Sequence, residues 1–310
     1  EQRTYYFGPA QSGAAPPQLE LPATVFEARG YRQLEGVFLH APELFNEQIN
    51  ANLAKANSDL TTLFGGRPFA EEILGALDGG LRFVAVRQPA DSADPLTASI
   101  RLPGFALIGQ LKNPADAQRP LRIAFQTAVG FVNLNAAQQA MPPLEIETER
   151  GPQRTILSAS YWPDGDPAHG AEQPMMGAHA IRMQLSPCLA FQDNAVILAS
   201  TKSLATTLCD RLAEQARHSQ PGIHGHAQTV HTAVSIDGPA LAQLLADNRQ
   251  HLIAQNMLEK GHRRGEAEQE IDGLATLLSF FAAADAQLTV DSDRLEGHVR
   301  LHPAPVEAGP

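Results

Sequence analysis

Apolar residues recur at two different spacings along this chain, and each spacing predicts a different element. Over residues 44–64 they fall three and four positions apart, which places them on one face of a helix on the order of 35 Å long. The opposite face is polar, so we expect this helix to lie on a sheet with one side in water. Gly65-Gly66 ends it, because glycine suits a left-handed C-terminal cap. Apolar runs at 36–39 and 81–86 predict a strand before and after this helical segment.

The same order of elements recurs near the other end of the chain. An apolar run at 233–236 leads into Asp237-Gly238-Pro239, a long helix, a break at 261–265, a second helix and a strand at 287–290. We interpret the two stretches as copies of one unit. Their matched positions hold no nucleophile, ligand set or phosphate-binding loop, so the repeat predicts architecture rather than chemistry.

The remaining pattern predicts further strands and two more helices. Strands are expected at 104–111, 144–148, 155–159, 188–191, 195–200 and 294–301, and helices at 114–140 and 202–217. Strands that follow one another as hairpins favour an α+β fold with antiparallel sheets. We therefore predict two pseudo-repeated lobes of antiparallel sheet, each covered on one face by long helices. The expected segments are an N-terminal arm at 1–30, lobes at 31–180 and 181–302, and a tail at 303–310.

Charge and hydropathy narrow the class of partner. The chain has 34 Asp and Glu against 23 Lys and Arg, a net charge of −11, so we expect no nucleic-acid partner. Its apolar runs are shorter than the roughly 20 residues that a membrane-spanning helix needs, so we expect no span. Residue 1 is Glu rather than Met, which predicts a trimmed chain, and a removed signal peptide or a proteolytic cut would each explain it.

Three stretches together resemble a known group of proteins. They are Leu102-Pro103-Gly104-Phe105-Ala106-Leu107 with Asn113-Pro114 opening a helix, the hairpin around Gly151, and the run from Leu189 through Gln192-Asp193-Asn194 to Ser200-Thr201. In this order they resemble exported bacterial cell-envelope proteins known only as a domain of unknown function, which carry repeated strand, helix and hairpin units. The resemblance implies a periplasmic or envelope setting. It implies no activity and no catalytic residue.

The two cysteines could form a disulfide. Cys188 opens a predicted strand and Cys209 lies on the predicted helix 202–217. Because that helix has to fold back on its own strands, the two thiols could come within bridging distance. A disulfide and two inert buried thiols both stay open.

Histidines form the densest set of possible metal ligands. His218, His224, His226 and His231 lie close in sequence, and His224 and His226 could point the same way from an extended loop. Imidazole is a good ligand for zinc and copper. No cysteine or carboxylate at a recognised spacing completes a four-ligand site, so solvated loop histidines are the simpler interpretation. His224, His226 and His231 are kept as candidates for a metal site.

Two other polar groups fit structural roles better than catalytic ones. Asp164-Gly165-Asp166 lacks the further oxygen ligands and the closing Glu of a calcium loop, so a turn explains it. Ser200 and Lys202 are separated by one residue rather than the two of a Ser-x-x-Lys dyad. We therefore interpret Ser200 or Thr201 as a helix N-cap.

An aromatic pair marks the mouth of the long polar segment 162–178. Tyr161 and Trp162 follow the predicted strand 155–159. Such a pair can anchor a partner, and it can equally cover the edge of a sheet. We keep Tyr161 and Trp162 as candidates for a binding site.

These observations predict a non-catalytic, extracytoplasmic protein that works by binding or assembly, without a cofactor. Its partner would be a protein or an envelope component, bound by the loops at 87–97 and 162–179 or by an exposed sheet face. A first alternative is a carrier of an apolar small molecule in a groove between sheet and helices. Six phenylalanines could line that groove: Phe64, Phe69, Phe83, Phe105, Phe125 and Phe131. A second alternative is a metal-dependent hydrolase.

Overall fold

The computed structural model describes residues 3–9, 12–88, 100–139, 141–161, 185–218, 229–291 and 294–304. Its strands are β1 (Thr24–Tyr31), β2 (Leu77–Val86), β3 (Gly104–Leu111), β4 (Leu144–Arg150), β5 (Arg154–Tyr161), β6 (Cys188–Gln192), β7 (Ala195–Ala199), β8 (Thr229–Asp237), β9 (Phe281–Asp291) and β10 (Arg294–Pro303). They form one antiparallel sheet in the order β10-β9-β8-β1-β2-β3-β7-β6-β5-β4. The fold is α+β, as the sequence predicted.

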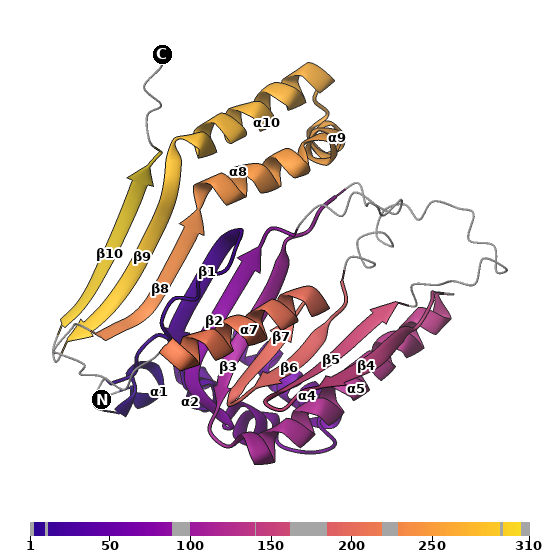
Figure 1. Cartoon of the computed structure of the whole chain (residues 1–310), viewed down its shortest axis with the longest axis vertical. Coiled ribbons are helices and arrows are strands. Elements are labelled where there is room, and N and C mark those ends of the chain that lie inside the picture. Colours follow the sequence, from indigo (N-terminus) through magenta and orange to yellow (C-terminus); the bar gives the residue numbers. More distant parts are fainter. Residues whose placement is uncertain are drawn as a thin grey trace.

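Helices lie on both faces of this sheet and beyond one of its ends. They are α1 (Thr4–Phe7), α2 (Leu34–Leu39), α3 (Ala41–Leu44), α4 (Glu47–Leu63), the π-helix η2 (Phe69–Leu74), α5 (Pro114–Gln138), α7 (Lys202–His218), α8 (Gly238–Asp247), α9 (Arg249–Lys260) and α10 (Arg264–Ser279). Helix α7 packs on β3, β5, β6 and β7, whereas α5 packs on β4 and β6. Figure 1 shows α7 lying across the strands, and α8 and α10 beyond the ends of β8 and β9.

Strand β6 shows that α7 and α5 cover opposite faces. Its Cys188 and Ala190 belong to the apolar cluster beneath α7, and the alternating Leu189 and Phe191 belong to the cluster beneath α5. Successive side chains of a strand point to opposite faces, so β6 is buried on both. We call the two sides of the sheet the α7 face and the α5 face.

Most of the predicted elements are confirmed. The structure contains β2, β3, the hairpins β4–β5 and β6–β7, the helices α5 and α7, and the strands β8 to β10 close to the predicted positions. The single long helix predicted before the break at 261–265 is wrong, because Asn248 divides it into α8 and α9. The predicted break at Gly261 is a left-handed cap with φ of 69°. The N-cap of α7 is Thr201, whose Oγ1 accepts a hydrogen bond from Leu204 N at 3.3 Å.

The strand predicted at 36–39 is wrong. These residues lie in α2, and the strand of this region is β1, earlier in the chain. A Cβ atom on Gly36 would come within 2.3 Å of Tyr5 Cβ, so Gly36 provides the close approach of α2 to α1. The sequence pattern missed β1 because Glu27 interrupts its apolar residues. The structure buries this carboxylate against Arg82 of β2, with Oε1 3.1 Å from Nε.

The position predicted for the helix 44–64 is also wrong, although the helix itself is confirmed as α4. It was expected to lie on the sheet, but its main neighbours among the described residues are α3, η2 and α5. Its Ile49 stays 41 % exposed. The apolar stripe therefore serves contacts between helices, because α5 occupies the neighbouring part of the sheet.

Both ends of the chain contain a strand, a set of helices and a returning antiparallel strand. Strands β1 and β2 flank the N-terminal helices, and β8 and β9 flank α8, α9 and α10. The first strands of the two units, β1 and β8, pair antiparallel with each other. All strands thus share one sheet. The boundaries predicted for the lobes stay predictions, although β1 begins inside the arm predicted at 1–30.

Candidate functional site

Apolar side chains continue along the α5 face well beyond α5 itself. Directly opposed residues of neighbouring strands point to the same face, so the pairing of the strands defines rows across the sheet. One row runs from β10 to β7 through Val299, Ala286, Val234, Ala28, Phe83, Leu107 and Leu198. Every member is apolar, although the members come from segments far apart in the sequence.

A second row lies beside the first. It contains Leu301, Ala284, Ile236, Phe26, Ala85 and Phe105, from β10 to β3. We call these two rows together the open face. No sequence pattern within a single strand reveals it, because the rows exist only once the register of the sheet is known.

Burial along the first row ends where α5 ends. The residue that follows Leu198 across the sheet is Leu189 of β6, which is only 5 % exposed beneath α5. On the open face, by contrast, six large side chains are exposed, from 37 % at Phe83 to 77 % at Val299, while Phe26, Val234 and Ile236 are half-buried. The same kind of side chain is therefore buried at one end of a row and in water at the other.

The open face is shallow. Its hollow of about 210 Å³ lies over β1, β2 and β3 and is lined by Ala28, Phe83 and Leu107 among others. The rings of Phe26 and Phe83 meet edge to face, with centroids 6.0 Å apart. Pockets that enclose small molecules usually measure about 300–1,000 Å³. This surface has the shape of a contact area rather than of an enclosed pocket.

The α7 face over β1 and β2 is closed by the chain that precedes β1. Leu19 is buried there, and its N–H donates to Glu27 Oε1 at 3.4 Å. Arg82 Nη2 donates to the carbonyl of Pro17. Burial lowers the pKa of Arg82, and the neighbouring Glu27 carboxylate partly opposes that shift. This charged pair fastens β1, β2 and the N-terminal segment together.

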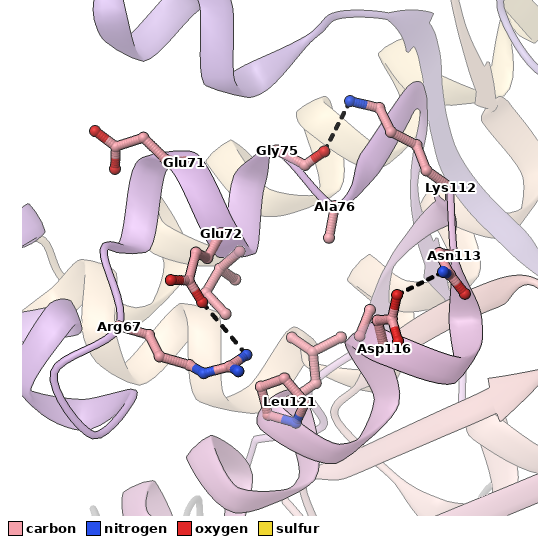
Figure 2. A pocket seen from close by; sticks show the side chains of 12 residues that line it. Arg67, Glu71, Glu72, Gly75, Ala76, Lys112, Asn113, Asp116 and Leu121 are labelled. Carbon is pink, nitrogen blue, oxygen red and sulfur yellow. Dashed lines mark hydrogen bonds and ion pairs between the residues drawn. The ribbon is translucent and has the colours of Figure 1, made fainter.

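A deeper hollow of about 540 Å³ lies between η2 and the start of α5 (Figure 2). Figure 2 shows Arg67 facing Glu72, at 3.4 Å, and Lys112 Nζ donating to the Gly75 carbonyl at 2.7 Å. Asn113 Nδ2 donates to Asp116 Oδ2 at 2.5 Å. These side chains satisfy one another, which leaves the open face as the stronger candidate site.

Of the three candidate metal ligands, the structure describes only His231. His231 is buried in β8, with its ring centroid 5.3 Å from that of Phe7 and 6.5 Å from that of Tyr31. His224 and His226 lie outside the described residues. Within the described ranges, no three His, Cys, Asp or Glu side chains are grouped so that they could hold a metal ion.

The candidate aromatic pair is only partly described. Tyr161 ends β5 and is half-buried against the cluster beneath α5. Trp162 lies outside the described residues, together with the loop 162–179 and its Asp164-Gly165-Asp166, and most of the loop 87–97. A binding role for Tyr161 and Trp162 stays a prediction.

The structure brings the two cysteines into one cluster. Cys188 of β6 and Cys209 of α7 are both buried beneath α7, and both are free thiols. Burial raises the pKa of Cys188 to about 12 and that of Cys209 to about 11. The Cys188 thiol donates to the carbonyl of Ser186 at 3.0 Å. Both thiols therefore stay protonated at neutral pH and act as apolar core groups.

The six phenylalanines of the predicted groove are distributed over several places. Phe83 and Phe105 lie on the open face, whereas Phe125 is buried beneath α5. Phe64 and Phe69 pack on each other, with ring centroids 5.5 Å apart, and Phe131 of α5 is 56 % exposed.

Comparisons with protein-family models, with curated proteins and with solved structures found no match to this chain. The resemblance to exported envelope proteins therefore stays a prediction. The helices in the described ranges include none that is long and apolar enough to cross a bilayer.

Proposed function

We propose that this chain is a non-catalytic, extracytoplasmic protein that binds a protein partner on the open face of its sheet. The observation that carries the proposal is the pair of apolar rows, in which six large side chains stay 37 % to 77 % exposed where α5 no longer covers them. Contiguous exposed apolar surface is unfavourable in water, and in soluble proteins it marks interaction sites. Binding a partner would remove this surface from water.

The shape of the open face favours a protein over a small molecule. The first row crosses seven strands, and strands about 4.8 Å apart give it a length of roughly 29 Å. Protein interfaces reach that size, whereas a small apolar ligand needs a deeper enclosure. The hollow of about 210 Å³ within the face suits a protruding side chain of the partner.

We further propose that the open face is built from two pseudo-repeated lobes. Both ends of the chain supply a strand–helices–strand unit, and the units meet at the antiparallel pair β1 and β8. The centre of the open face lies on this junction, where Phe26 opposes Ile236 and Ala28 opposes Val234. The extracytoplasmic setting rests on the resemblance alone.

Site-specific cross-linking tests the proposal. A photo-crosslinking phenylalanine analogue is placed at Leu107 of the full chain, which is illuminated inside the cells that produce it. We expect one discrete cross-linked protein, because Leu107 is 46 % exposed on the first row and lines the hollow of the open face. The matched control places the analogue at Lys55, a 76 % exposed position of α4, where that product should be absent.

Two results would overturn the proposal. One is a set of products at Leu107 that does not differ from that at Lys55. The other is an apolar small molecule bound to the purified wild-type chain in native mass spectrometry and absent from the Leu107→Asp variant, which would establish a carrier instead.

A further inference from the structure

Strand β10 ends the sheet as a long and regular edge. It pairs with β9 on one side, and its register is unbroken from Arg294 to His302. The opposite side has no neighbouring strand among the described residues. An edge strand of this length presents a row of N–H and C=O groups that can pair with another chain.

The backbone of β10 tells which residues face the free edge. The N–H of Ala304 donates to Phe280 O, at 2.9 Å, on the β9 side. Backbone groups alternate in direction along a strand, so the even-numbered residues of β10 pair with β9. Leu295, Gly297, Val299 and Leu301 then present their N–H and C=O groups outward. Pro303 also falls on the outward side, where its missing N–H removes no bond from the sheet.

We propose that two copies of this chain pair antiparallel through β10, about a two-fold axis at His298. In this register Leu295 lies opposite the partner's Leu301, and Gly297 opposite the partner's Val299. The outward N–H and C=O groups of all four residues are satisfied in both copies. Glu296 lies opposite the partner's Arg300, and symmetry repeats this pair of opposite charges.

Neighbouring registers are less favourable. A register centred on Gly297 places Arg294 opposite the partner's Arg300, so like charges meet. A register centred on Val299 brings Pro303, which has no N–H, into the new ladder opposite the partner's Leu295. Of these three registers, only the one centred on His298 places a carboxylate opposite a guanidinium.

The charges concerned are accessible for such pairing. Glu296 approaches His298 at 3.6 Å, with both side chains substantially exposed. Within the described part of the chain, Arg300 has no ion-pair partner, and its side chain is exposed. Both can therefore engage a second copy without breaking a buried contact.

The other edge of the sheet is unsuited to self-pairing. Strand β4 carries Glu145, Glu147 and Glu149 at alternate positions on one face, so two copies of β4 would oppose like charges. Glu147 already pairs with Lys202 at 2.6 Å, and Glu149 with Arg154 at 3.0 Å. Self-association is therefore expected at one edge, which closes a dimer rather than a fibre.

The proposed dimer is separate from the partner site of the open face and enlarges it. Val299 ends the first row of that face and Leu301 ends the second, so the faces of the two copies would join along the axis. Changes at Leu107 should leave the dimer intact. Failure of the dimer would therefore leave the proposed partner site standing, and the reverse also holds.

Charge reversal tests the register. Sedimentation equilibrium of the full wild-type chain should show a monomer–dimer equilibrium. E296R or R300E alone makes both symmetric pairs like-charged, which should weaken the dimer about tenfold in dissociation constant. An equimolar mixture of the two variants, or the double variant E296R/R300E, should restore it, because opposite charges face each other again. E145R makes the same charge change at the β4 edge and should leave the dissociation constant unchanged.

Several outcomes would overturn this proposal. They are a wild-type chain that stays monomeric up to its solubility limit, open-ended polymers instead of a dimer, and a dimer that the two single reversals do not weaken. Circular dichroism of each variant checks that the fold is retained, as expected for changes at exposed positions of an edge strand.

Discussion

Strands β6 and β10 belong to one sheet but lie in opposite environments. All five residues of β6 are buried between α7 and α5, whereas almost every side chain of β10 is exposed. Yet both strands present apolar side chains to the α5 face, Leu189 and Phe191 in β6, Val299 and Leu301 in β10. The comparison shows that apolar patterning decides the chemistry of a sheet face, and that the packing of helices decides whether water reaches it.

The difference has an energetic consequence. Full burial of a large apolar side chain stabilises a fold by about 1.5–3 kcal/mol, and β6 and α7 gain this in the folded monomer. The apolar residues of β10 gain little of it until another surface covers them. Substitutions should therefore cost most under the helices and least at the β10 edge.

The largest effect is expected at the buried ion pair of Glu27 and Arg82, whose side chains are 2 % and 3 % exposed. Arg82→Leu leaves the Glu27 carboxylate buried without its countercharge, which should lower the free energy of unfolding by about 3–5 kcal/mol. The double variant E27L/R82L removes both charges and should recover most of this loss. Urea unfolding followed by circular dichroism measures both values.

An exposed ion pair provides the control for this test. Arg264 and Glu268 lie 2.9 Å apart on α10 with much of their surface in water, so Arg264→Leu should change stability by less than about 0.5 kcal/mol. A loss for Arg82→Leu no larger than for Arg264→Leu would show that the pair is not buried as described.

The next largest effect is expected when a buried leucine and an exposed leucine are each replaced by alanine. Leu208 of α7 is fully buried over β6, and Leu301 of β10 is 61 % exposed. Leu208→Ala should cost about 3 kcal/mol, since it removes buried methyl groups and leaves a cavity. Leu301→Ala should cost less than about 0.5 kcal/mol in the monomer. Equal losses in chemical denaturation at low protein concentration would contradict the contrast between the two regions.

Some elements of this architecture can be predicted from local sequence patterns, and others cannot. The continuous apolar run of β6 and the spacing of Leu204 and Leu208 on α7 are local patterns, so both elements were predicted. Strand β1 was not predicted, because a glutamate in this position suggests a residue exposed to water. Its partner Arg82, which allows Glu27 to be buried, lies 55 residues later in the chain. Burial of a charge depends on a distant partner that no local pattern reveals.

The open face could not be predicted from the sequence. Phe83 and Phe105 were suspected as ligand-contacting residues, but their alignment with Val234 and Val299 depends on the registers of several strand pairs. A shift of one residue in any pair would turn the side chains to the other face. The placement of α4 failed for a related reason, since an amphipathic stripe does not tell which apolar surface it meets.

The smallest expected effect concerns the contact between the end of β2 and the end of α8. Arg87, next to the end of β2, holds Asp247 at the end of α8 through two hydrogen bonds of 2.6 and 3.1 Å. The hydrogen bond from Arg87 holds the pKa of Asp247 below its usual value. Since the folded-state pKa is lowered, the pair stabilises the fold above the unfolded-state pKa of about 4 and loses this contribution as the pH falls through the folded-state value.

Asp247→Asn should therefore cost about 1–2 kcal/mol at pH 7, and the gap to the wild type should narrow steadily below about pH 4. Unfolding curves recorded from pH 7 downward measure this gap. Asp59→Asn serves as the control, because Asp59 pairs with Lys55 at an exposed site on α4 and should show no comparable gap at any pH. A loss for Asp247→Asn that stays constant with pH would mean that its carboxylate charge does not stabilise the contact between α8 and the end of β2, and that this contact rests on packing alone.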